Sequence, residues 1–306
     1  MVQNILISGS LVYDRIMDFP GKFSDHILPE KIHILNVAFP IEKMEENFGG
    51  TAGNIAYNLS LLGESPYILT CVGKDFSAYE KWLLKNKIKI SEIKKLKNKY
   101  TAGAYIMTDK ADNQITGFNG AAMNIPRGKV KSGILKNSIA IVSPGNIQDM
   151  ADYPNLYKQK KVRYIFDPGQ AIPGLNKKAL ISGLSGAEIL IGNDYEIEMI
   201  KKKIGWPEKK LITKIKILII TKGEKGSVIY AQGKKIIIKA CRPRKVIDPT
   251  GAGDAYRAGV IKGLLLNWDF KKIGQFASAV ASFAVEKYGA QKHRFNMREV
   301  ERRIKV

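Results

Sequence analysis

Short runs of apolar residues alternate along the chain with segments whose apolar residues recur at helical spacing. The runs predict strands at Ile5–Ser8, Tyr67–Val72, Ile139–Val142, Tyr164–Phe166, Ile189–Ile191 and Ile217–Thr221. The helical spacing predicts helices at Asn54–Leu62, Phe76–Asn86, Asp149–Gln159, Lys177–Gly183, Tyr195–Lys203, Ala252–Leu266, Phe270–Lys287 and Asn296–Ile304. Near-continuous apolar strands separated by helices are typical of a parallel sheet covered on both faces. The pattern therefore predicts a doubly wound, mostly parallel α/β core.

Two segments break this alternation, because neither contains a helix that would complete a βαβ unit. The first, Val12–Phe48, holds a Phe-Pro-Gly turn and the run Lys31–Phe39, which we expect to be extended. The second predicts a hairpin between Tyr105–Thr108 and Ile115–Phe118. We expect residues 12–48 and 103–118 to form a small β-rich lid over the carboxyl ends of the core strands. Residues 1–11, 49–102 and 119–306 are then expected to form the core domain.

The composition fits a globular chain, and its charge is strongly basic. Of the 306 residues 45% are hydrophobic and 25% charged, and 50 basic against 28 acidic side chains give a net charge of +22. A nucleic-acid-binding protein usually gathers its basic residues in one patch. Here lysines are spread along the chain, as at Lys81, Lys158 and Lys271. This spread favours a general lysine bias, and a basic nucleic-acid-binding protein stays the alternative from another class.

Membrane insertion and a disulfide framework are not expected. No apolar run approaches the roughly 20 residues of a membrane span, and the start of the chain lacks the basic stretch of a signal peptide. Cys71 and Cys241 are too few for a disulfide framework, which favours a cytoplasmic location. The histidines His26, His33 and His293 share no metal-ligand spacing.

The segment Asp248–Asp254 (DPTGAGD) precedes an apolar helical pattern and offers the clearest local chemistry. The small residues Gly251, Ala252 and Gly253 stand at a helix start, where backbone N–H groups are unpaired and the dipole is positive, a site suited to phosphate oxygens. The Asp254 carboxylate lies in the first turn, where it could accept a proton from an attacking hydroxyl. The positive helix end is expected to keep that carboxylate ionised. An ordinary helix start, in which Asp254 only offsets the dipole, explains the same residues equally well.

A second glycine cluster, Gly49–Asn54 (GGTAGN), precedes another predicted helix. Close approach of the backbone to a ligand would explain the glycines, and the Asn54 amide could bind hydroxyls. A flexible hinge between lid and core is the alternative. The phosphate-binding motif GxxxxGK[ST] is absent from the sequence.

Taken together and in order, four motifs resemble those of the ribokinase-like, or PfkB, carbohydrate and nucleoside kinases. They are Gly49–Gly63 (GGTAGNIAYNLSLLG), Asn193–Glu196 (NDYE), Thr221–Gly226 (TKGEKG) and Asp248–Gly259 (DPTGAGDAYRAG). The opening Gly9–Asp14 (GSLVYD), the stretch Asp18–Pro29 (DFPGKFSDHILP) and the DPTG form of the last motif are most similar to bacterial-type adenosine kinases.

The resemblance implies ATP- and Mg²⁺-dependent phosphorylation of the adenosine 5′-hydroxyl. It makes Asp254 the general base and Gly251, Ala252 and Gly253 the anion hole. It places at the substrate Ser10, Asp14, Gly49, Gly50 and Asn54, with Phe118 and Gln170 at the base. It places at ATP the residues Asn193, Thr221, Gly223 and Gly226. It puts Glu196 in the Mg²⁺ region and Asp248 and Thr250 around a K⁺ ion.

The predicted base pocket departs from the resembled kinases. Those kinases tend to have a glutamine, a serine and an aromatic residue where this chain has Ala171, Ala38 and Ala104. A sugar kinase or another nucleoside kinase of the same family therefore stays the alternative function. Lids of this type often pair edge to edge, so a homodimer through the lid is expected, whereas no specific nucleic acid and no membrane is expected as a partner.

Overall fold

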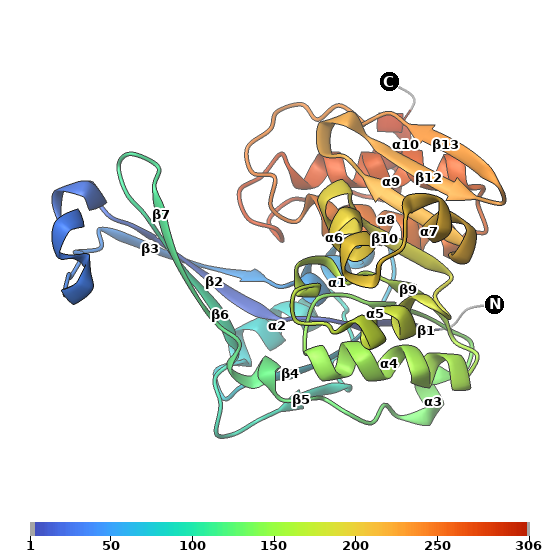
Figure 1. Ribbon diagram of the computed structural model, residues 1–306, viewed down its shortest axis with the longest axis horizontal. Coiled ribbons are helices and arrows are strands. Elements are labelled where there is room, and N and C mark those ends of the chain that lie inside the picture. Colours follow the sequence, from blue (N-terminus) through green and yellow to red (C-terminus); the bar gives the residue numbers. More distant parts are fainter. Residues whose placement is uncertain (1–3, 305–306) are drawn as a thin grey trace.

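A nine-stranded sheet forms the centre of this computed structural model, which describes residues 4–304 (Figure 1). Its order is β13-β12-β11-β10-β9-β8-β1-β4-β5, parallel from β5 to β11 and antiparallel across β11, β12 and β13. The strands are β1 (Asn4–Ser8), β4 (Tyr67–Val72), β5 (Ile93–Lys95), β8 (Ser138–Val142), β9 (Arg163–Phe166), β10 (Ile189–Asn193), β11 (Ile217–Thr221), β12 (Ser227–Ala231) and β13 (Lys234–Ile238). All six strands predicted from the apolar runs are present, which confirms the doubly wound core.

Helices cover both faces of this sheet, as predicted. They are α1 (Thr51–Leu61), α2 (Ser77–Lys85), α3 (Ser132–Leu135), α4 (Ile147–Gln159), α5 (Lys177–Leu184), α6 (Asp194–Ile204), α7 (Glu208–Lys214), α8 (Ala252–Leu265), α9 (Phe270–Ala284) and α10 (Met297–Ile304). The sequence pattern did not predict α7 or the β12–β13 hairpin. Among the described residues, no helix is long and apolar enough to cross a membrane.

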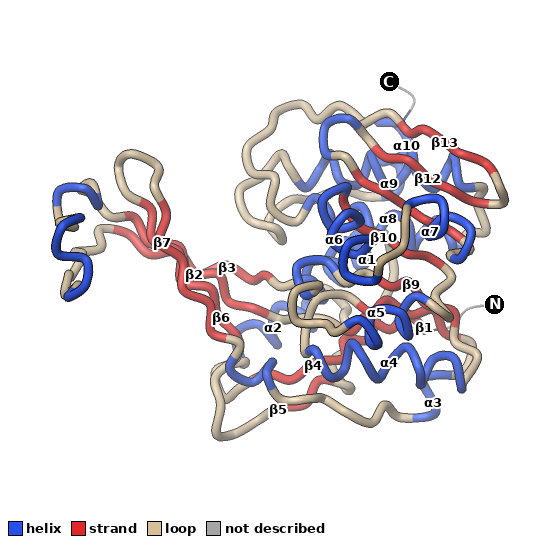
Figure 2. Tube along the Cα trace, viewed as in Figure 1, coloured by secondary structure: helices blue, strands red, loops and turns tan. Residues whose placement is uncertain are grey.

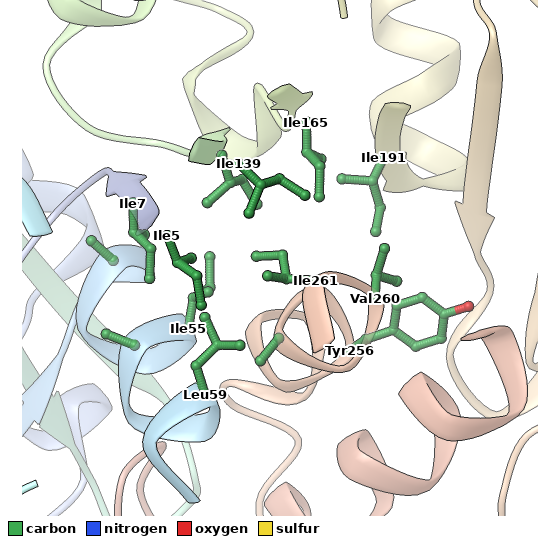
Figure 3. Packing of buried hydrophobic residues seen from close by; sticks show 14 of the residues in the cluster. Ile5, Ile7, Ile55, Leu59, Ile139, Ile165, Ile191, Tyr256, Val260 and Ile261 are labelled. Atoms are coloured by element: carbon green, nitrogen blue, oxygen red, sulfur yellow. The ribbon is translucent and has the colours of Figure 1, made fainter. Parts of the chain in front are cut away.

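Side chains that alternate along the strands build a core on each face of the sheet. On one face, Ile5 and Ile7 of β1 pack with Ile55 of α1 and Ile261 of α8, all at most 5% exposed (Figure 3). On the other face, Leu6 belongs to a second core with residues of α4, α5 and α6. This alternation is the period-two pattern of a strand buried on both sides. It holds α1 and α8, which carry the two glycine motifs, against the same face of the sheet.

A separate four-stranded sheet extends from the core as an arm (Figures 1 and 2). Its order is β3-β2-β6-β7, with the strands β2 (Val12–Asp18), β3 (Lys43–Gly49), β6 (Ala102–Thr108) and β7 (Gln114–Asn119). The hairpin predicted around residues 105–118 is therefore confirmed. The extended conformation predicted for Lys31–Phe39 is wrong over its first part, because Pro29 begins a 3₁₀ helix that continues to Ile34. Proline favours that first position, since its fixed φ suits a helix and its missing N–H is not needed there.

Candidate active site

A cleft of about 980 Å³ lies where the carboxyl ends of the core strands meet the second sheet. The loops after β1, β8 and β9 and the ends of β10 and β11 line its core side, whereas Asp14, Ala104 and Phe118 line it from the second sheet. Ligands of open α/β sheets bind at this edge, because the loops there are free to vary while the strands hold them in place. The arrangement identifies this cleft as the candidate site.

The start of α8 forms one wall of the cleft. Gly251 caps the helix with a φ of 80°, and a side chain there would place its Cβ 2.7 Å from that of Ala290. Within residues 4–304, the N–H groups of Gly253 and Asp254 have no hydrogen-bond partner, whereas that of Ala252 donates to the Pro249 carbonyl. Two unpaired N–H groups at the positive end of a 14-residue helix can bind an anion.

The Asp254 carboxylate lies on the floor of the same cleft. Its Oδ2 accepts a hydrogen bond from Nδ2 of Asn54 at 2.8 Å. Burial raises its pKa to about 6, against the lowering effects of Arg257 and of the Asn54 hydrogen bond. The expected strong preference for the ionised form is therefore reduced, although at pH 7 the carboxylate is still ionised by roughly ten to one. A pKa near the working pH suits a group that must accept a proton and later release it.

A buried cation stands one helical turn beyond Asp254. The Arg257 guanidinium, 7% exposed, pairs with Asp167 through Nε and through Nη2 at 2.7 Å from Oδ1, and Nη2 lies 3.9 Å from Glu196. Burial alone would lower the pKa of Arg257, but the Asp167 carboxylate raises it, so the group stays charged. Both Arg257 and Asp167 line the cleft. They place a buried ion pair, with no net charge of its own, beside the α8 start.

The glycines of the second cluster make room for neighbouring groups of the protein itself. A Cβ at Gly50, whose φ is 88°, would lie 2.5 Å from the Ser10 carbonyl oxygen, and one at Gly49 would lie 2.1 Å from Asp14. The Ser10 hydroxyl accepts a hydrogen bond from the Thr51 N–H, and the Ser10 carbonyl accepts one from Ala52. The first N–H groups of α1 are thus already paired. Unlike the α8 start, this helix start does not offer an anion site.

The Asp14 side chain faces the cleft from β2 and has no hydrogen-bond partner among the described residues. Burial and, to a lesser extent, the nearby Asp248 carboxylate raise its pKa to about 6. Burial acts on Asp248 in the same direction, but hydrogen bonds from Thr250 and Gly289 lower its pKa overall. A carboxylate with free lone pairs at the edge of a cleft can accept from two neighbouring hydroxyls of a ligand.

The end of the cleft beside Phe118 is lined by apolar and amide side chains. Phe118 is 58% exposed, so its ring face is available for stacking. Exposed amides at Asn124 and Gln170 have no side-chain hydrogen bond within the described residues, whereas the Asn146 amide is used to cap α4. Each free amide can both donate and accept. This end can therefore hold a flat, polar-edged ring.

The opposite end of the cleft contains the start of α6. The Asn193 side chain accepts from the Glu196 N–H at 2.8 Å, and Glu196 Oε2 accepts from the Asn193 N–H at 2.7 Å, forming a capping box. Burial raises the pKa of Glu196. Thr221 and Gly223 line the same end. The capping box fixes Asn193 and leaves the second carboxylate oxygen of Glu196 unengaged.

The sequence matches one known protein family over most of its length. The model of the pfkB family carbohydrate kinases matches residues 12–294. The chain belongs to the pfkB family. This assignment confirms the resemblance seen in the four sequence motifs, and the protein is therefore a kinase.

Solved and sequenced members of the family resemble this kinase over nearly their full length. A nucleoside kinase of Methanocaldococcus jannaschii is 35% identical over 266 residues, 86% of this chain and 87% of that protein. The ligand-free nucleoside kinase of Burkholderia thailandensis superposes with a TM-score of 0.86 at 34% identity, covering 98% of this chain and 99% of the other. The same enzyme has been solved in complex with ADP-inosine (TM-score 0.82, 35% identity, 98% and 95% coverage). These similarities confirm the ribokinase-like fold.

The cleft brings together most of the site residues predicted from the sequence. Those that line it are Ser10, Asp14, Gly50, Asn54, Phe118, Gln170, Asn193, Glu196, Thr221, Gly223, Thr250, Gly251, Gly253 and Asp254. Those that lie outside the lining are Gly49, Gly226, Asp248 and Ala252. Gly226, with a φ of 85°, is required by packing, because a Cβ there would lie 2.0 Å from the Ile238 carbonyl oxygen.

The sequence motifs indicated no role for three residues in or next to the cleft. Arg257 lies inside the last motif, and Asp167 directly follows β9, so its place at the carboxyl end of a parallel strand was the available signal. Gln291, which contacts Asn54, gave no comparable signal, because it lies in a loop with no distinguishing pattern.

Proposed function

We propose that this kinase transfers the γ-phosphoryl group of ATP to the 5′-hydroxyl of adenosine, giving AMP and ADP. The observation that carries the proposal is the position of Asp254, beside unpaired N–H groups at the α8 start and in one cleft with Asp14 and Phe118. The similar nucleoside kinases support a nucleoside as acceptor. Complexes of the Burkholderia enzyme with ADP-inosine support an adenine nucleotide as donor.

In the proposed reaction, Asp254 acts as the general base. Its carboxylate accepts the proton of the 5′-hydroxyl while that oxygen bonds to the γ-phosphorus and the bond from phosphorus to the ADP oxygen breaks. The N–H groups of Gly253 and Asp254 bind oxygens of the transferring group, and Gly251 lines the same anion hole, whereas the Ala252 N–H is held by the Pro249 carbonyl. Arg257, held in place by Asp167 through Nε and Nη2, can turn its remaining N–H groups toward the place where negative charge develops.

The nucleoside is proposed to bind along the lid side of the cleft. Asp14 accepts hydrogen bonds from the ribose hydroxyls, with Asn54, Gly50 and the backbone near Gly49 beside them, and Ser10 shapes this loop through its contacts with α1. Phe118 stacks on the base. This placement directs the 5′-hydroxyl toward Asp254.

The free amides at the base end support a second candidate substrate, inosine. Asn124 and Gln170 can each donate and accept, so neither selects by itself between the amino group of adenosine and the keto group of inosine. No charged side chain lines this end within residues 104–147 of the described chain. A purine nucleoside is therefore proposed as the substrate class, with adenosine first.

ATP is proposed to occupy the end of the cleft near α6 and β11. Thr221 and Gly223 form its border, with Asn193 at the phosphates, and the Gly226 turn follows directly behind them. Among residues 4–304, no three acidic, cysteine or histidine side chains gather as a metal site. The free carboxylate oxygen of Glu196 suits Mg²⁺ that arrives with the phosphates, because Mg²⁺ is usually held by few protein ligands together with phosphate and water. When bound, the ion neutralises phosphate charge.

A monovalent cation is a further element of the proposal. Asp248 and Thr250 lie in the loop before α8, and Asp248 is tied to Thr250 and Gly289 by hydrogen bonds. Carbonyl and carboxylate oxygens of this loop are proposed to hold K⁺, which would steady the anion hole. Activity in K⁺ that is no higher than in tetramethylammonium would contradict this assignment.

The second sheet is proposed to act as the lid, formed by residues 12–48 and 103–118 on a core of 1–11, 49–102 and 119–306. Large apolar side chains are exposed at its far end, including Ile32 (64%) and Ile34 (77%). Burial of such a surface would favour a homodimer through the lid. The proposal assigns a cytoplasmic enzyme with no nucleic-acid or membrane partner, so the net charge of +22 needs no dedicated binding face.

A panel of acceptors tests the proposed function directly. Adenosine, inosine, guanosine, ribose and fructose would each be assayed with ATP and Mg²⁺, and kcat/KM compared. We expect adenosine to exceed ribose by at least ~100-fold, about 2.7 kcal/mol of transition-state binding. Equal or faster turnover of ribose or fructose would overturn the nucleoside assignment and leave a sugar kinase of the same family.

A further inference from the structure

A loop near the C-terminus joins the two glycine motifs behind the cleft. In this loop Ala290 packs on Gly251 at the α8 start, and the neighbouring Gln291 donates from Nε2 to Oδ1 of Asn54 at 3.0 Å. Gln291 is 3% exposed and Asn54 is 6% exposed. The contact spans 237 residues of sequence, so it depends on the complete fold.

Every polar atom of the Gln291 side chain is engaged. Its Oε1 accepts from the indole Nε1 of Trp82 at 2.9 Å, and its Nε2 donates both to Asn54 and to the Tyr79 hydroxyl at 2.7 Å. The Tyr79 hydroxyl in turn donates to the Gly49 carbonyl. Gly53 leaves the space for this cluster, because a Cβ there would lie 2.0 Å from the Tyr79 hydroxyl and 2.9 Å from Gln291 Nε2.

These contacts determine which way each amide points. An indole N–H can only donate, so Trp82 requires the oxygen of Gln291 on its side and sends the Gln291 NH₂ group toward Asn54. Asn54 must then turn its oxygen to Gln291 and its NH₂ group to Asp254. If Asn54 were reversed, its oxygen would face the Asp254 carboxylate, and two acceptors would oppose each other.

We propose that Gln291, oriented by Trp82, is a positioning residue for phosphoryl transfer that acts through Asn54 to keep a hydrogen-bond donor against the Asp254 carboxylate. The proposal rests on the proposed function in that it takes Asp254 to be the general base. Gln291 is outside the cleft lining and touches no substrate position. Its effect reaches the reaction through the protonation state of Asp254 rather than through substrate binding.

Other charged and titratable groups also face Asp254 and stay unchanged in the test. They are Arg257 on the same helix, Asp167 after β9, Glu196 on α6 and Tyr79 on α2. Asp14 has a pKa of about 6 as well, but it lies on the nucleoside side of the cleft, so saturating nucleoside removes its titration from kcat. His293 stays neutral above about pH 5, because burial lowers its pKa to about 4.

Two variants weaken the chain of hydrogen bonds from Trp82 through Gln291 and Asn54 to Asp254, called the relay below, without adding charge. Trp82→Phe removes the indole donor that orients Gln291, and Gln291→Met keeps a similar length but removes both the carbonyl and the NH₂ group of the amide. Asn54 is then free to reverse, which disfavours the ionised form of Asp254. Ser282→Ala, a change to a buried hydroxyl of α9 that hydrogen-bonds to Ala279 and Arg303, is the matched control.

The test is the pH profile of kcat from pH 5 to 9 at saturating ATP and acceptor, with thermal melting of each variant. We expect the acidic limb of both relay variants to move upward by about half to one pH unit. Relative to the parent enzyme, their kcat should fall about two- to fivefold more at pH 6 than at pH 8.5, and the double variant should resemble the single ones. Ser282→Ala should keep the parent profile.

An unshifted acidic limb, or a loss by the same factor at pH 6 and pH 8.5, would overturn the relay. If Gln291→Met fails to fold, Trp82→Phe alone decides, because it leaves Gln291 in place. The acceptor panel decides the proposed function separately, and the pH profiles are recorded with whichever acceptor the enzyme prefers. A sugar as the preferred acceptor would thus reject the nucleoside assignment and still test the relay.

Discussion

The Asn54 side chain donates a hydrogen bond to Asp254 across 200 residues of sequence, with Nδ2 and Oδ2 2.8 Å apart. Asn54 ends the first glycine motif and lies in the first turn of α1. Asp254 ends the segment DPTGAGD and lies in the first turn of α8. The two helices pack on the same face of the sheet, so their starts meet at one cleft (Figure 3). Two motifs that are separate in the sequence therefore form a single site.

The raised pKa of Asp254 predicts a pH-dependent effect of Asp254→Asn on stability. Burial raises this pKa from 3.8 to about 6, so the folded state binds the proton more tightly than the unfolded chain. The ionised carboxylate thus destabilises the fold above about pH 6, and its cost vanishes below about pH 4. We expect Asp254→Asn to raise the free energy of unfolding by about 1–3 kcal/mol at pH 8 and to leave it unchanged near pH 4.

Urea unfolding at both pH values measures this difference. The exposed Asp152 on α4 provides the control, since Asp152→Asn should change stability little at either pH. A less stable Asp254→Asn protein at pH 8 would contradict the account, because it would mean that the carboxylate supports the fold.

The close packing of Gly50 predicts a large cost for a single methyl group. A Cβ at Gly50 would lie 2.5 Å from the Ser10 carbonyl oxygen, a backbone atom that cannot move aside easily. Gly63 has a similar φ of 83°, but a Cβ there would have no heavy atom within 4 Å. We expect Gly63→Ala to cost about 1 kcal/mol through its φ alone and Gly50→Ala about 3 kcal/mol or more. Equal costs in denaturant unfolding would show that the contact with Ser10 does not matter.

The same glycines show which part of the site could be predicted from sequence. A cluster of glycines before a helix indicates close backbone approach or a hinge, and the structure shows close approach, but to Ser10, Asp14 and the Tyr79–Gln291 pair. Those partners lie on other elements and carry no local signal. The motif at α8 was more informative, since unpaired N–H groups follow directly from small residues at a helix start.

The fold was largely predictable because buried parallel strands are short, continuous apolar runs. Ile217–Thr221 and Tyr67–Val72 match the observed strands residue for residue. The β12–β13 hairpin escaped prediction, although Gln232 and Gly233, both with positive φ, form its two-residue turn. The 3₁₀ helix that begins at Pro29 was not predicted, because its apolar residues Ile32 and Ile34 are exposed and do not form a helical face packed on a core.

Phe118 on β7 should contribute to nucleoside affinity. Loss of one stacking ring costs about 1–3 kcal/mol per base, so Phe118→Ala should raise KM for adenosine by about tenfold and leave kcat/KM for ribose unchanged. Ile115 on the same strand is 46% exposed and lies outside the cleft lining, so Ile115→Ala is the matched control. An unchanged adenosine KM in Phe118→Ala would remove this ring from the base pocket.

Closure of the lid predicts protection from proteases. The segment between β2 and β3, residues 19–42, projects from the core on the second sheet (Figure 1). If that sheet closes over bound ligand, adenosine with a non-hydrolysable ATP analogue should slow cutting there several-fold and leave cutting in the core unchanged. Mass mapping of early fragments measures this, and equal rates with and without ligands would indicate a fixed second sheet.

The general-base role of Asp254 is the central claim, and the turnover of Asp254→Asn tests it most directly. Asparagine keeps the shape and can still accept the hydrogen bond from Asn54, but it cannot take a proton from the 5′-hydroxyl. We predict that kcat falls by roughly 10²–10⁴-fold, the usual contribution of a positioned general base, while calorimetry shows adenosine and ATP binding within a few-fold of the parent enzyme. A folded Asp254→Asn protein with near-normal kcat would contradict the claim.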